Sequence, residues 1–530
     1  MSATATTVFE LFADNLPRGA DRPFLVQDGK DMTYGEVAGL VDKLAGYLQS
    51  RGVRPGDRVV VQLRKGPAEV AAMLAVAQAG AAFVNVNAQW TADQLRYVAA
   101  DCGARLVIVE AGMAHALGDE PLPGIERILV AGAAVSTPGR DGWDAVERAR
   151  PGVPAPRLDT ELAAIIYTSG STGQPKGVML SHRNIVAGAR SVTRYLALDA
   201  DDRLLGVLPY SFDYGLNQLT TMMLTGGAVV HLPVPLAAEA VRVMVEQRVT
   251  GVAAVPPLWH QIIRVLDARP TAFPALRRVT NSGGSIAGDY LRRFPDHFPG
   301  ADIYLMYGLT EAFRSTYLRP DLFAAKPGSI GRAIPGAEVY VIKAGVGLAQ
   351  PGEQGELVHR GPLVSQGYWG RPEATRDKIR PCPELAALIG DEPVVHSGDT
   401  VRIDADGDLW FVGRNDAMIK TSGFRVSPDE VEELVYRSGM VADAVAFGVA
   451  DPLLGQVIAV AASPLDGHDV DALLAYCRRV MPSYMQPRAI HLWPEAMPRT
   501  ASGKIARTEV IRACAVPDCP ASTATATATG

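Results

Sequence analysis

The most informative part of this sequence is the stretch from Ile165 to His182, which reads IIYTSGSTGQPKGVMLSH. The apolar residues Leu162–Ile166 predict a short buried strand that leads into it. A loop rich in hydroxyls and glycines follows, and Val178–Leu180 then resumes the apolar pattern. Ser181 and His182 are expected to begin the next helix. The stretch therefore predicts a strand, a glycine-rich loop, a second apolar segment and a helix, in that order.

The loop has the composition of a polyphosphate cradle. Glycine lets the backbone approach a ligand closely, and consecutive N–H groups in such a turn bind anions. Hydroxyls and a mobile lysine charge add donors. The residues concerned are Thr168, Ser169, Gly170, Ser171, Thr172, Gly173, Lys176 and Gly177. This is not the GxxxxGK[ST] loop, because Gly177 follows Lys176 where Ser or Thr is needed. The alternative for a Ser/Gly-rich run is a surface turn without a ligand.

Length and composition exclude several classes of protein. A chain of 530 residues exceeds the usual size of a single core, so two or more domains are expected. A net charge of −6 argues against a nucleic-acid-binding protein. The 5 cysteines include no CxxC pair, which argues against a zinc site or disulfide framework and favours a cytoplasmic location. The most apolar stretch, Val70–Val86, predicts a buried helix followed by a strand and not a membrane span, and no signal peptide is expected.

Residues 9–160 alternate helical patterns with short Val- and Ile-rich runs, and further apolar runs follow the loop. The expected strands include Val59–Leu63, Ala82–Val86, Leu106–Val109, Ile128–Val130, Leu204–Pro209 and Val252–Pro256. Strands that alternate with helices predict parallel sheets covered by helices.

Three further motifs are MYGLTEA at Met306–Ala312, FVGRNDAMIKTSGFR at Phe411–Arg425 and MPRTASGKIAR at Met497–Arg507. Together with the loop, they resemble the superfamily of adenylate-forming enzymes: acyl-CoA ligases, carrier-protein adenylation domains and luciferases. The resemblance extends over Phe9–Ile511. It implies an α/β fold: a large N-terminal domain with parallel sheets covered by helices plus a small β-barrel-like subdomain, and a small mobile α+β C-terminal domain.

The resemblance also implies domain boundaries. Residues 1–415 would form the large AMP-binding domain, and residues 416–515 the small domain, with Asp416 as the hinge between them. Residues 516–530 end in alternating Thr and Ala and are expected to be a disordered tail.

ATP and Mg²⁺ are the cofactors that the resemblance implies. By the same resemblance Tyr307 packs on adenine, Asp399 holds the ribose, and Lys504 enters the active site to stabilise charge between carboxylate and α-phosphate. Glu311, with Thr168, would hold Mg²⁺, which prefers one or two carboxylates plus phosphate oxygens. The expected catalytic residues are Lys176, Thr310 and Lys504. The expected ATP-binding residues are Thr168, Ser169, Gly170, Ser171, Thr172, Gly173, Lys176, Gly283, Gly284, Tyr307, Gly308, Thr310, Asp399 and Arg414.

The segment YSFDYGLNQ at Tyr210–Gln218 matches one wall of the acid-binding pocket in the resembling families. Its Asp213 stands between two aromatic residues, and a carboxylate in an aromatic pocket is costly unless a cation meets it. In amino-acid adenylation domains the similar Asp binds the substrate amine, which implies that role for Asp213. The alternative is a helix N-cap, because Asp213 precedes an apolar run.

Arg314 follows Glu311 closely and is expected near the pocket. A guanidinium there would bind a second substrate carboxylate as a fork; the alternative is a pair with a structural Asp or Glu. The expected substrate-binding residues are Asp213, Ser282, Gly308 and Arg314. They resemble the stand-alone β-amino-acid adenylation enzymes of macrolactam biosynthesis, particularly the 3-methylaspartate-activating type. The surrounding sequence also resembles the AMP-forming ligases associated with exosortase loci.

The predicted reaction is attack of a substrate carboxylate on the α-phosphate of MgATP, which gives acyl-AMP and pyrophosphate without a protein nucleophile. The acyl group would then pass to a phosphopantetheine thiol. No carrier segment is visible after Arg507, so the thiol is expected to belong to a separate carrier protein or to CoA. A relative that binds nucleotide without turnover is the remaining alternative, against which Lys176, Glu311 and Lys504 argue. No nucleic-acid or membrane partner is expected.

Overall fold

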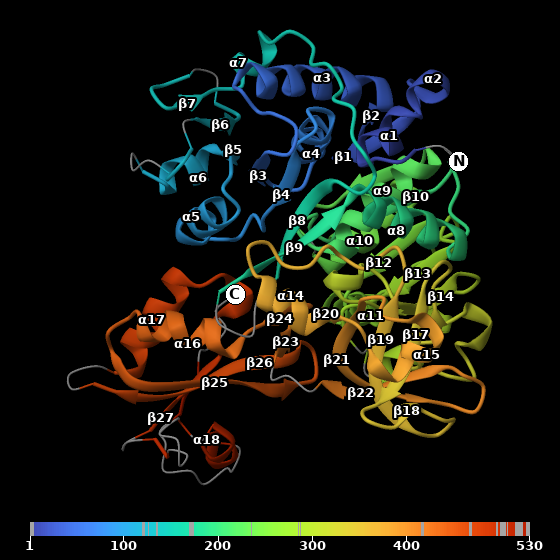
Figure 1. The fold of residues 1–530 in the computed structure, drawn as a ribbon, viewed down its shortest axis with the longest axis vertical. Coiled ribbons are helices and arrows are strands. Elements are labelled where there is room, and N and C mark those ends of the chain that lie inside the picture. Colours follow the sequence, from blue (N-terminus) through green and yellow to red (C-terminus); the bar gives the residue numbers. More distant parts are fainter. Residues whose placement is uncertain are drawn as a thin grey trace. The chain divides into compact units, whose positions relative to one another are not determined.

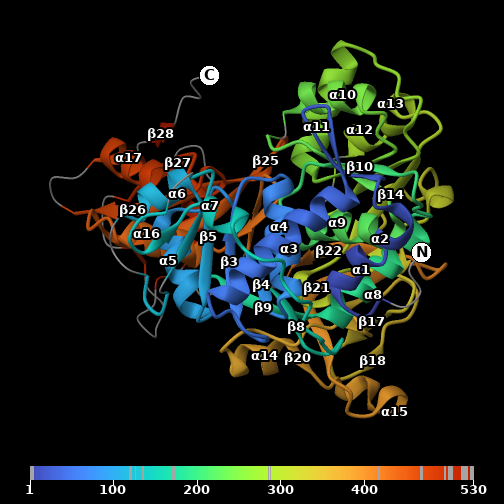
Figure 2. The same cartoon turned by 90° about the horizontal axis from the view of Figure 1, so that it is seen from above.

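The structure is a computed structural model, and it divides into two compact units by the contacts between Cα atoms. It describes residues 5–118, 122–125, 127–133, 136–168, 174–234, 236–284, 286, 288–414, 418–465, 469–493, 497–498, 505, 507–514 and 523–525. The large unit comprises residues 1–88, 92–167 and 177–414, and the small unit comprises residues 89–91, 168–176 and 415–530. Figures 1 and 2 show the elements of both units.

One sheet has the strand order β7-β6-β5-β3-β4-β8-β9. Its strands are β3 (Arg58–Gln62), β4 (Ala82–Asn85), β5 (Leu106–Glu110), β6 (Ile128–Ala131), β7 (Arg140–Asp141), β8 (Leu162–Thr168) and β9 (Lys176–Ser181). β3 pairs in parallel with β4 and β5, because helices α4 (Pro67–Gln78) and α5 (Ala92–Asp101) form the crossovers. α4 packs on β3, on β4 and on α3 (Tyr34–Ser50). The strands and the buried helix that apolar runs predicted here are confirmed.

A second sheet has the order β16-β15-β14-β13-β12-β10-β11-β1-β2. Its strands are β1 (Pro23–Gln27), β2 (Lys30–Thr33), β10 (Arg203–Gly206), β11 (Ala228–His231), β12 (Gly251–Ala254), β13 (Arg278–Asn281), β14 (Asp302–Tyr307), β15 (Thr316–Tyr317) and β16 (Arg332–Ala333). The neighbours from β11 to β14 are parallel, so their carboxyl ends meet at one edge, where ligands bind in such sheets.

Helices pack on this second sheet. α8 (His182–Tyr195) packs on α9 (Asp213–Thr225), and α10 (Ala237–Glu246) packs on α11 (Pro256–Ala268). β12 ends at Ala254, earlier than predicted, because Pro256 begins α11, and proline suits the first turn of a helix. The other helices of the large unit are α1 (Val8–Ala13), α2 (Leu16–Gly19), α6 (Ala111–Ala116), α7 (Asp144–Glu147), α12 (Gly288–Leu291) and α13 (Phe294–His297).

The predicted β subdomain of the large unit is an antiparallel sheet with the order β18-β17-β19-β21-β20, and β22 pairs with β21. Its elements are β17 (Glu338–Lys343), β18 (Gly347–Leu348), β19 (Gln354–Arg360), α14 (Pro372–Lys378), β20 (Ile379–Arg380), α15 (Ala386–Ile389), β21 (Val394–Ile403) and β22 (Leu409–Arg414). Short 3₁₀ helices are η1 (Thr310–Ala312), η2 (Pro320–Leu322) and η3 (Pro383–Leu385).

The small unit has a sheet of order β24-β23-β26-β27-β28, with β25 beside β26. Its elements are β23 (Ile419–Thr421), β24 (Phe424–Val426), α16 (Pro428–Tyr436), β25 (Val441–Asp451), β26 (Gly455–Pro464), α17 (Val470–Val480), η4 (Ser483–Met485), β27 (Ala489–Leu492), α18 (Arg507–Cys514) and β28 (Thr523–Thr525). The three residues of β28 pair with β27, and the disordered tail over residues 516–530 stays a prediction. The rest of that prediction lies outside the described residues.

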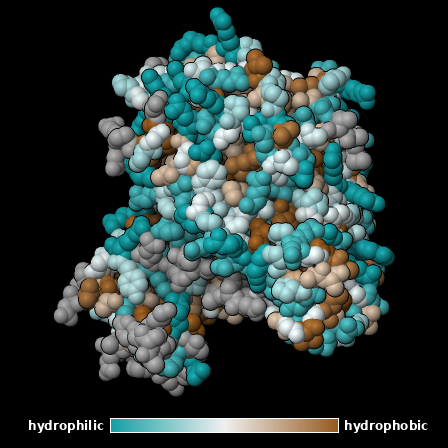
Figure 3. All heavy atoms as spheres, in the orientation of Figure 1, coloured by the Kyte–Doolittle hydropathy of each residue, from teal (hydrophilic) through white to brown (hydrophobic). Residues whose placement is uncertain are grey.

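The two units together confirm the predicted mixed α/β fold class. Among the described residues, no helix has both the length and the apolar character that a membrane crossing requires. On the face seen in Figure 3, hydrophobic residues lie in patches among a larger number of hydrophilic ones.

Candidate functional site

Several predicted site residues lie where strand β13 ends. The strand stops at Asn281, whose side chain donates to the carbonyl oxygen of Gly284 at 3.0 Å, and buried Ser282 lies in this turn. Gly283 has a φ of +82°, which glycine adopts without steric cost. A Cβ on Gly283 would lie 3.8 Å from Cζ of Phe212. The turn after β13 is therefore next to the segment that precedes α9.

The end of β14 meets the β subdomain. The hydroxyl of Tyr307 donates a hydrogen bond to Asp399 Oδ2 (2.5 Å), and the ring centroids of Tyr307 and Phe411 are 6.3 Å apart. Asp399 pairs across β21 and β22 with the backbone of Arg414. The structure thus brings Tyr307 into contact with Asp399, 92 residues later in the chain, and places Asp399 opposite Arg414 on the next strand.

The residues just after β14 form the tight turn η1. Gly308 precedes it, and Thr310 is buried within it. The half-buried Glu311 accepts a hydrogen bond from the hydroxyl of Tyr368 on its Oε1, and its backbone oxygen accepts from the N–H of Ser365 at 2.8 Å. These contacts fix the orientation of the carboxylate that was predicted to bind a cation.

Asp213 and Arg314 meet in the interior of the large unit. Neither side chain is more than 3% exposed, and Arg314 Nη1 lies 3.4 Å from Asp213 Oδ2. The N-cap position of α9 is Phe212, one residue before Asp213, but Asp213 still accepts from a backbone donor at the start of the helix, as the alternative interpretation expects. Asp213 is the first helical residue, and its Oδ1 accepts from the N–H of Tyr214 at 2.9 Å. Burial raises the pKa of Asp213, and the charge of Arg314 offsets part of that shift.

The guanidinium of Arg314 is only partly satisfied. Nη1 also donates to the carbonyl oxygen of Phe313 at 3.1 Å, and Cζ lies 4.5 Å from the ring centroid of Tyr214. Nε and Nη2 are buried, and neither has a hydrogen-bond partner within the described part of the chain. These two nitrogens form the edge that binds a carboxylate through parallel N–H bonds. Because a buried unpaired donor costs about 1–3 kcal/mol, the arrangement favours an anionic ligand at this edge.

Part of the predicted site lies outside the described residues. These positions are Ser169, Gly170, Ser171, Thr172, Gly173, Asp416 and Lys504, together with the side chain of Arg414. The two ends of the predicted phosphate loop are described: Thr168 is the last residue of β8, and Lys176 is the first residue of β9. The helix expected after this loop begins at His182, with Ser181 as its N-cap.

Lys65 is a buried residue of this region that the sequence analysis missed. Its Nζ donates to the carbonyl oxygen of Leu208 and lies 3.5 Å from the ring centroid of Tyr210, in the segment that leads to α9. The hydroxyl of Tyr210 in turn pairs with His231 Nε2 at 2.7 Å. Burial lowers the pKa of Lys65, and Glu69 counteracts this shift. A buried lysine has no local sequence signal, because the residues around Lys65 have the composition of an ordinary surface turn.

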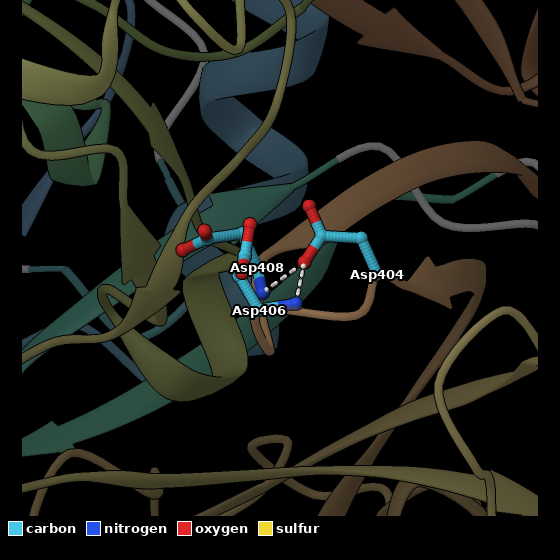
Figure 4. A group of neighbouring side chains, drawn as sticks. All are labelled: Asp404, Asp406 and Asp408. Atoms are coloured by element: carbon cyan, nitrogen blue, oxygen red, sulfur yellow. Dashed lines mark hydrogen bonds between the residues drawn. The ribbon is translucent and has the colours of Figure 1, made fainter.

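Asp404, Asp406 and Asp408 bring carboxylate oxygens within 4.8 Å of one another, as metal ligands do. They lie in the turn between β21 and β22, where Asp404 Oδ1 accepts from the backbone N–H groups of the other two (Figure 4). Lys326 Nζ already lies 2.9, 2.8 and 2.5 Å from oxygens of the three residues, in that order, and Arg332 pairs with Asp408. The cluster therefore has its own cations and is a structural ion network.

Comparison with known proteins places this arrangement in a family. Residues 12–369 match the AMP-binding enzyme family, and residues 430–504 match the AMP-binding enzyme C-terminal domain. A feruloyl-CoA synthase from an Amycolatopsis species is 34% identical over 490 residues, which cover 91% of this chain and 94% of the relative. An L-proline–[L-prolyl-carrier protein] ligase from Streptomyces coelicolor is 33% identical over 532 residues, which cover 95% of this chain and 96% of the relative.

Solved structures agree on the fold. An ATP-bound MatB from Rhodopseudomonas palustris superposes with a TM-score of 0.69 at 24% identity, over 96% of this chain and 98% of that one. These two relatives are named for different acyl groups, feruloyl and L-prolyl, so the comparison does not point to a single substrate. The chain therefore belongs to the AMP-binding enzyme family and is an adenylate-forming ligase that activates a carboxylic acid.

Proposed function

We propose that this enzyme activates an amino acid of β-amino or aspartate-like type that carries a second carboxylate. The observation that carries the proposal is the buried Asp213–Arg314 pair with the open Nε–Nη2 edge of its guanidinium. Asp213 supplies a negative charge for the substrate ammonium group, and Arg314 supplies two parallel donors for the second carboxylate. Ser282 and Gly308, which lie at the ends of β13 and β14, complete the proposed substrate site.

In the first step, the substrate carboxylate attacks the α-phosphorus of ATP, the bond to the bridging oxygen breaks, and pyrophosphate leaves. The proposed catalytic residues are Lys176, Thr310 and Lys504, which position the phosphates and stabilise the charge that shifts between them. The proposed nucleotide contacts are Thr168, Ser169, Gly170, Ser171, Thr172, Gly173, Gly283, Gly284, Tyr307, Gly308, Asp399 and Arg414. The Tyr307–Asp399 hydrogen bond supports two of these assignments, because it places the residue expected to pack on adenine next to the residue expected to bind the ribose.

Glu311 and Thr168 are the residues that we propose hold Mg²⁺. A bound Mg²⁺ would neutralise charge on the phosphates, and it prefers one or two carboxylates beside phosphate oxygens and water. The fit is good at Glu311: Tyr368 orients the carboxylate through Oε1, and Oε2 has no protein partner among the described residues.

The acyl group would then pass to the phosphopantetheine thiol of a separate carrier protein. The similarity to a carrier-protein ligase supports this acceptor, while the similarity to a feruloyl-CoA synthase supports CoA as the alternative. We also propose that residues 1–415 and 416–515 act as two domains with Asp416 as the hinge between the two half-reactions.

The test is ATP–pyrophosphate exchange with aspartate-like acids, 3-aminobutyrate, α-amino acids and simple fatty acids. We expect exchange with aspartate-like acids above all others. Arg314→Leu should lower kcat/KM for these acids by about 30-fold or more, the equivalent of about 2 kcal/mol for a desolvated charge contact. It should leave 3-aminobutyrate much less affected. Asp213→Ala should abolish exchange with both amino acids and spare a simple acid.

Two results would contradict the proposal. Exchange only with unsubstituted acids would make the enzyme an acyl-CoA ligase in which the Asp213–Arg314 pair is structural. If Arg314→Leu lowered kcat/KM equally for aspartate-like acids and for 3-aminobutyrate, Arg314 would not bind a second carboxylate. A product assay with CoA and with a phosphopantetheinylated carrier protein then separates the two acceptors.

A further inference from the structure

The backbone just before Arg314 has an unusual conformation. Phe313 has φ +54° and ψ −51°, and the N–H of Arg314 donates to the carbonyl oxygen of Ala312 at 2.5 Å. This is a γ-turn with positive φ at its centre, a strained form that bulky residues rarely adopt. Such a conformation costs on the order of 1–3 kcal/mol and persists only where the surrounding structure enforces it.

The ring of Phe313 fits into a notch in helix α8, at Gly188. Phe313 is fully buried, and a Cβ on Gly188 would lie 2.3 Å from Cδ1 and 2.5 Å from Cε1 of its ring. These distances are far below van der Waals contact, so only glycine admits the ring at this point of the helix. Glycine in a helix interior is itself unfavourable, which makes close packing the physical reason for Gly188.

The turn sets the direction of the next side chain. Arg314 Nη1 donates back to the carbonyl oxygen of Phe313, and its Cζ lies 6.0 Å from the Phe313 ring and 4.5 Å from the Tyr214 ring. A Cβ on Gly308 would lie 3.2 Å from the Cα of Arg314, so the end of β14 also closes on this residue. The guanidinium is thus held on several sides, and the Nε–Nη2 edge is the part left without a partner among the described residues.

We propose that Phe313, seated in the Gly188 notch, is a positioning residue that aims the open edge of Arg314 at the second carboxylate of the substrate. The inference rests on the proposed function, because it concerns the same acid pocket. Bidentate recognition depends on the orientation of the planar fork, and a displacement of about 1 Å is enough to lose much of it. The strained backbone at Phe313 therefore holds Arg314 in the orientation that favours dicarboxylic amino acids over acids with a single carboxylate.

The test measures ATP–pyrophosphate exchange with an aspartate-like acid and with 3-aminobutyrate in Gly188→Ala, in Phe313→Gly and in the double variant. Each single variant should raise KM for the aspartate-like acid by about tenfold or more, with kcat nearly unchanged, because a contact made in both ground and transition states is weakened. The KM for 3-aminobutyrate should change by less than about threefold. Gly39→Ala in α3, where a Cβ would meet nothing within 4 Å, is the control.

The double variant tests the notch itself. Without the ring, the added methyl group at residue 188 has nothing to displace, so the double variant should match Phe313→Gly alone. Additive losses would show that Gly188 acts by another route and would overturn the role of the notch. If Phe313→Gly does not fold, Phe313→Ala replaces it in each arm, because alanine also removes the ring that fills the notch.

Arg314→Leu separates this inference from the proposed function. If Arg314→Leu leaves the preference between the two acids unchanged, the proposed function fails. If Arg314→Leu removes the preference while Gly188→Ala and Phe313→Gly retain it, only the positioning role fails. A parallel fall in kcat for both acids, with a lower Tm, would show that Phe313 is merely structural.

Discussion

Two aspartate–cation clusters of the large unit differ in how completely their polar groups are satisfied. In the turn between β21 and β22, Lys326 Nζ contacts Asp404, Asp406 and Asp408, and Arg332 adds a second cation. Beside α9, Arg314 contacts Asp213 through one nitrogen at 3.4 Å and leaves Nε and Nη2 without a described partner. In the first cluster there are more charged groups, and each meets an opposite charge. The second pair is more deeply buried, and two of its guanidinium nitrogens have no described partner.

We propose that this difference separates a structural ion network from a binding site. A network in which each charge meets an opposite charge stabilises a turn and has nothing left to offer a ligand. A buried guanidinium with an open edge is costly in isolation, and folded proteins tolerate this cost mainly at functional sites. Acidic residues in a sequence therefore say less about ligand binding than the unsatisfied atoms that the fold leaves beside them.

The largest expected effect comes from breaking the incomplete pair. Asp213→Leu leaves a buried guanidinium that cannot lose its proton, so the free energy of unfolding should fall by about 3–5 kcal/mol. Replacing both Asp213 and Arg314 by leucine removes both charges and should restore most of the stability. Arg314→Leu should cost less at lower pH, because burial raises the pKa of Asp213 and favours its neutral form.

Urea unfolding of the three variants at about pH 6 and about pH 8 checks this cycle. The exposed pair Arg242–Glu239 on α10 supplies the control, and Arg242→Leu should leave the unfolding midpoint almost unchanged. Single variants of the buried pair that stay within about 1 kcal/mol of the wild type would mean that its charges are solvated.

His359 of β19 extends the comparison to a polar side chain with no partner at all within the described residues. It is fully buried, it pairs across the sheet with Val339 and Val395, and neither ring nitrogen has a hydrogen-bond partner. Burial lowers the pKa of His359 from its ordinary 6.5 to about 4. The unfolded chain therefore binds a proton that the folded chain rejects, and stability falls as the pH drops from about 6.5 to about 4.

His359→Leu should remove up to about 3 kcal/mol of this acid sensitivity, because two to three pKa units correspond to that difference. Unfolding by urea between pH 7 and about pH 4 measures it, with the exposed His115→Gln as the control. A wild-type slope that persists in His359→Leu would assign the acid sensitivity to other groups.

Much of the architecture follows from local signals in the sequence. Runs such as Val59–Leu63 and Leu106–Val109 are apolar and β-branched, so they predict buried parallel strands within a residue or two of β3 and β5. The motif residues Tyr307 and Asp399 were expected at one nucleotide site, and the fold brings them into hydrogen-bond contact. Here local pattern and tertiary structure agree, as they do across most of a natural chain.

The contacts that we propose decide substrate specificity could not be predicted in the same way. Asp213 and Arg314 were expected to bind different groups of the substrate, but their mutual contact joins positions 101 residues apart. Phe313, which has a positive φ, packs its ring against Gly188 of helix α8, 125 residues earlier in the chain. Lys326 reaches Asp408 over 82 residues. Each of these features is created by packing between distant elements, and no periodicity or turn signal encodes it.

The smallest expected effect concerns the closed cluster. Lys326→Met removes the cation shared by Asp404, Asp406 and Asp408, so their carboxylates repel one another and Tm should fall by a few degrees, with substrate preference unchanged. The three oxygens, within 4.8 Å of one another, then resemble the ligands of a hard cation, and Ca²⁺ should restore part of the lost Tm.

Thermal unfolding with and without Ca²⁺ tests this expectation, and Lys343→Met, which breaks a more exposed pair with Glu353, is the matched control. In the wild type Ca²⁺ should have no effect, because Lys326 already occupies the position that a cation would take. A rise of the wild-type Tm with Ca²⁺ would show that the turn binds metal despite its lysine. In that case, a cluster whose charges are all paired would still bind a ligand. The pairing of charges would then not distinguish this cluster from the Asp213–Arg314 pair beside α9.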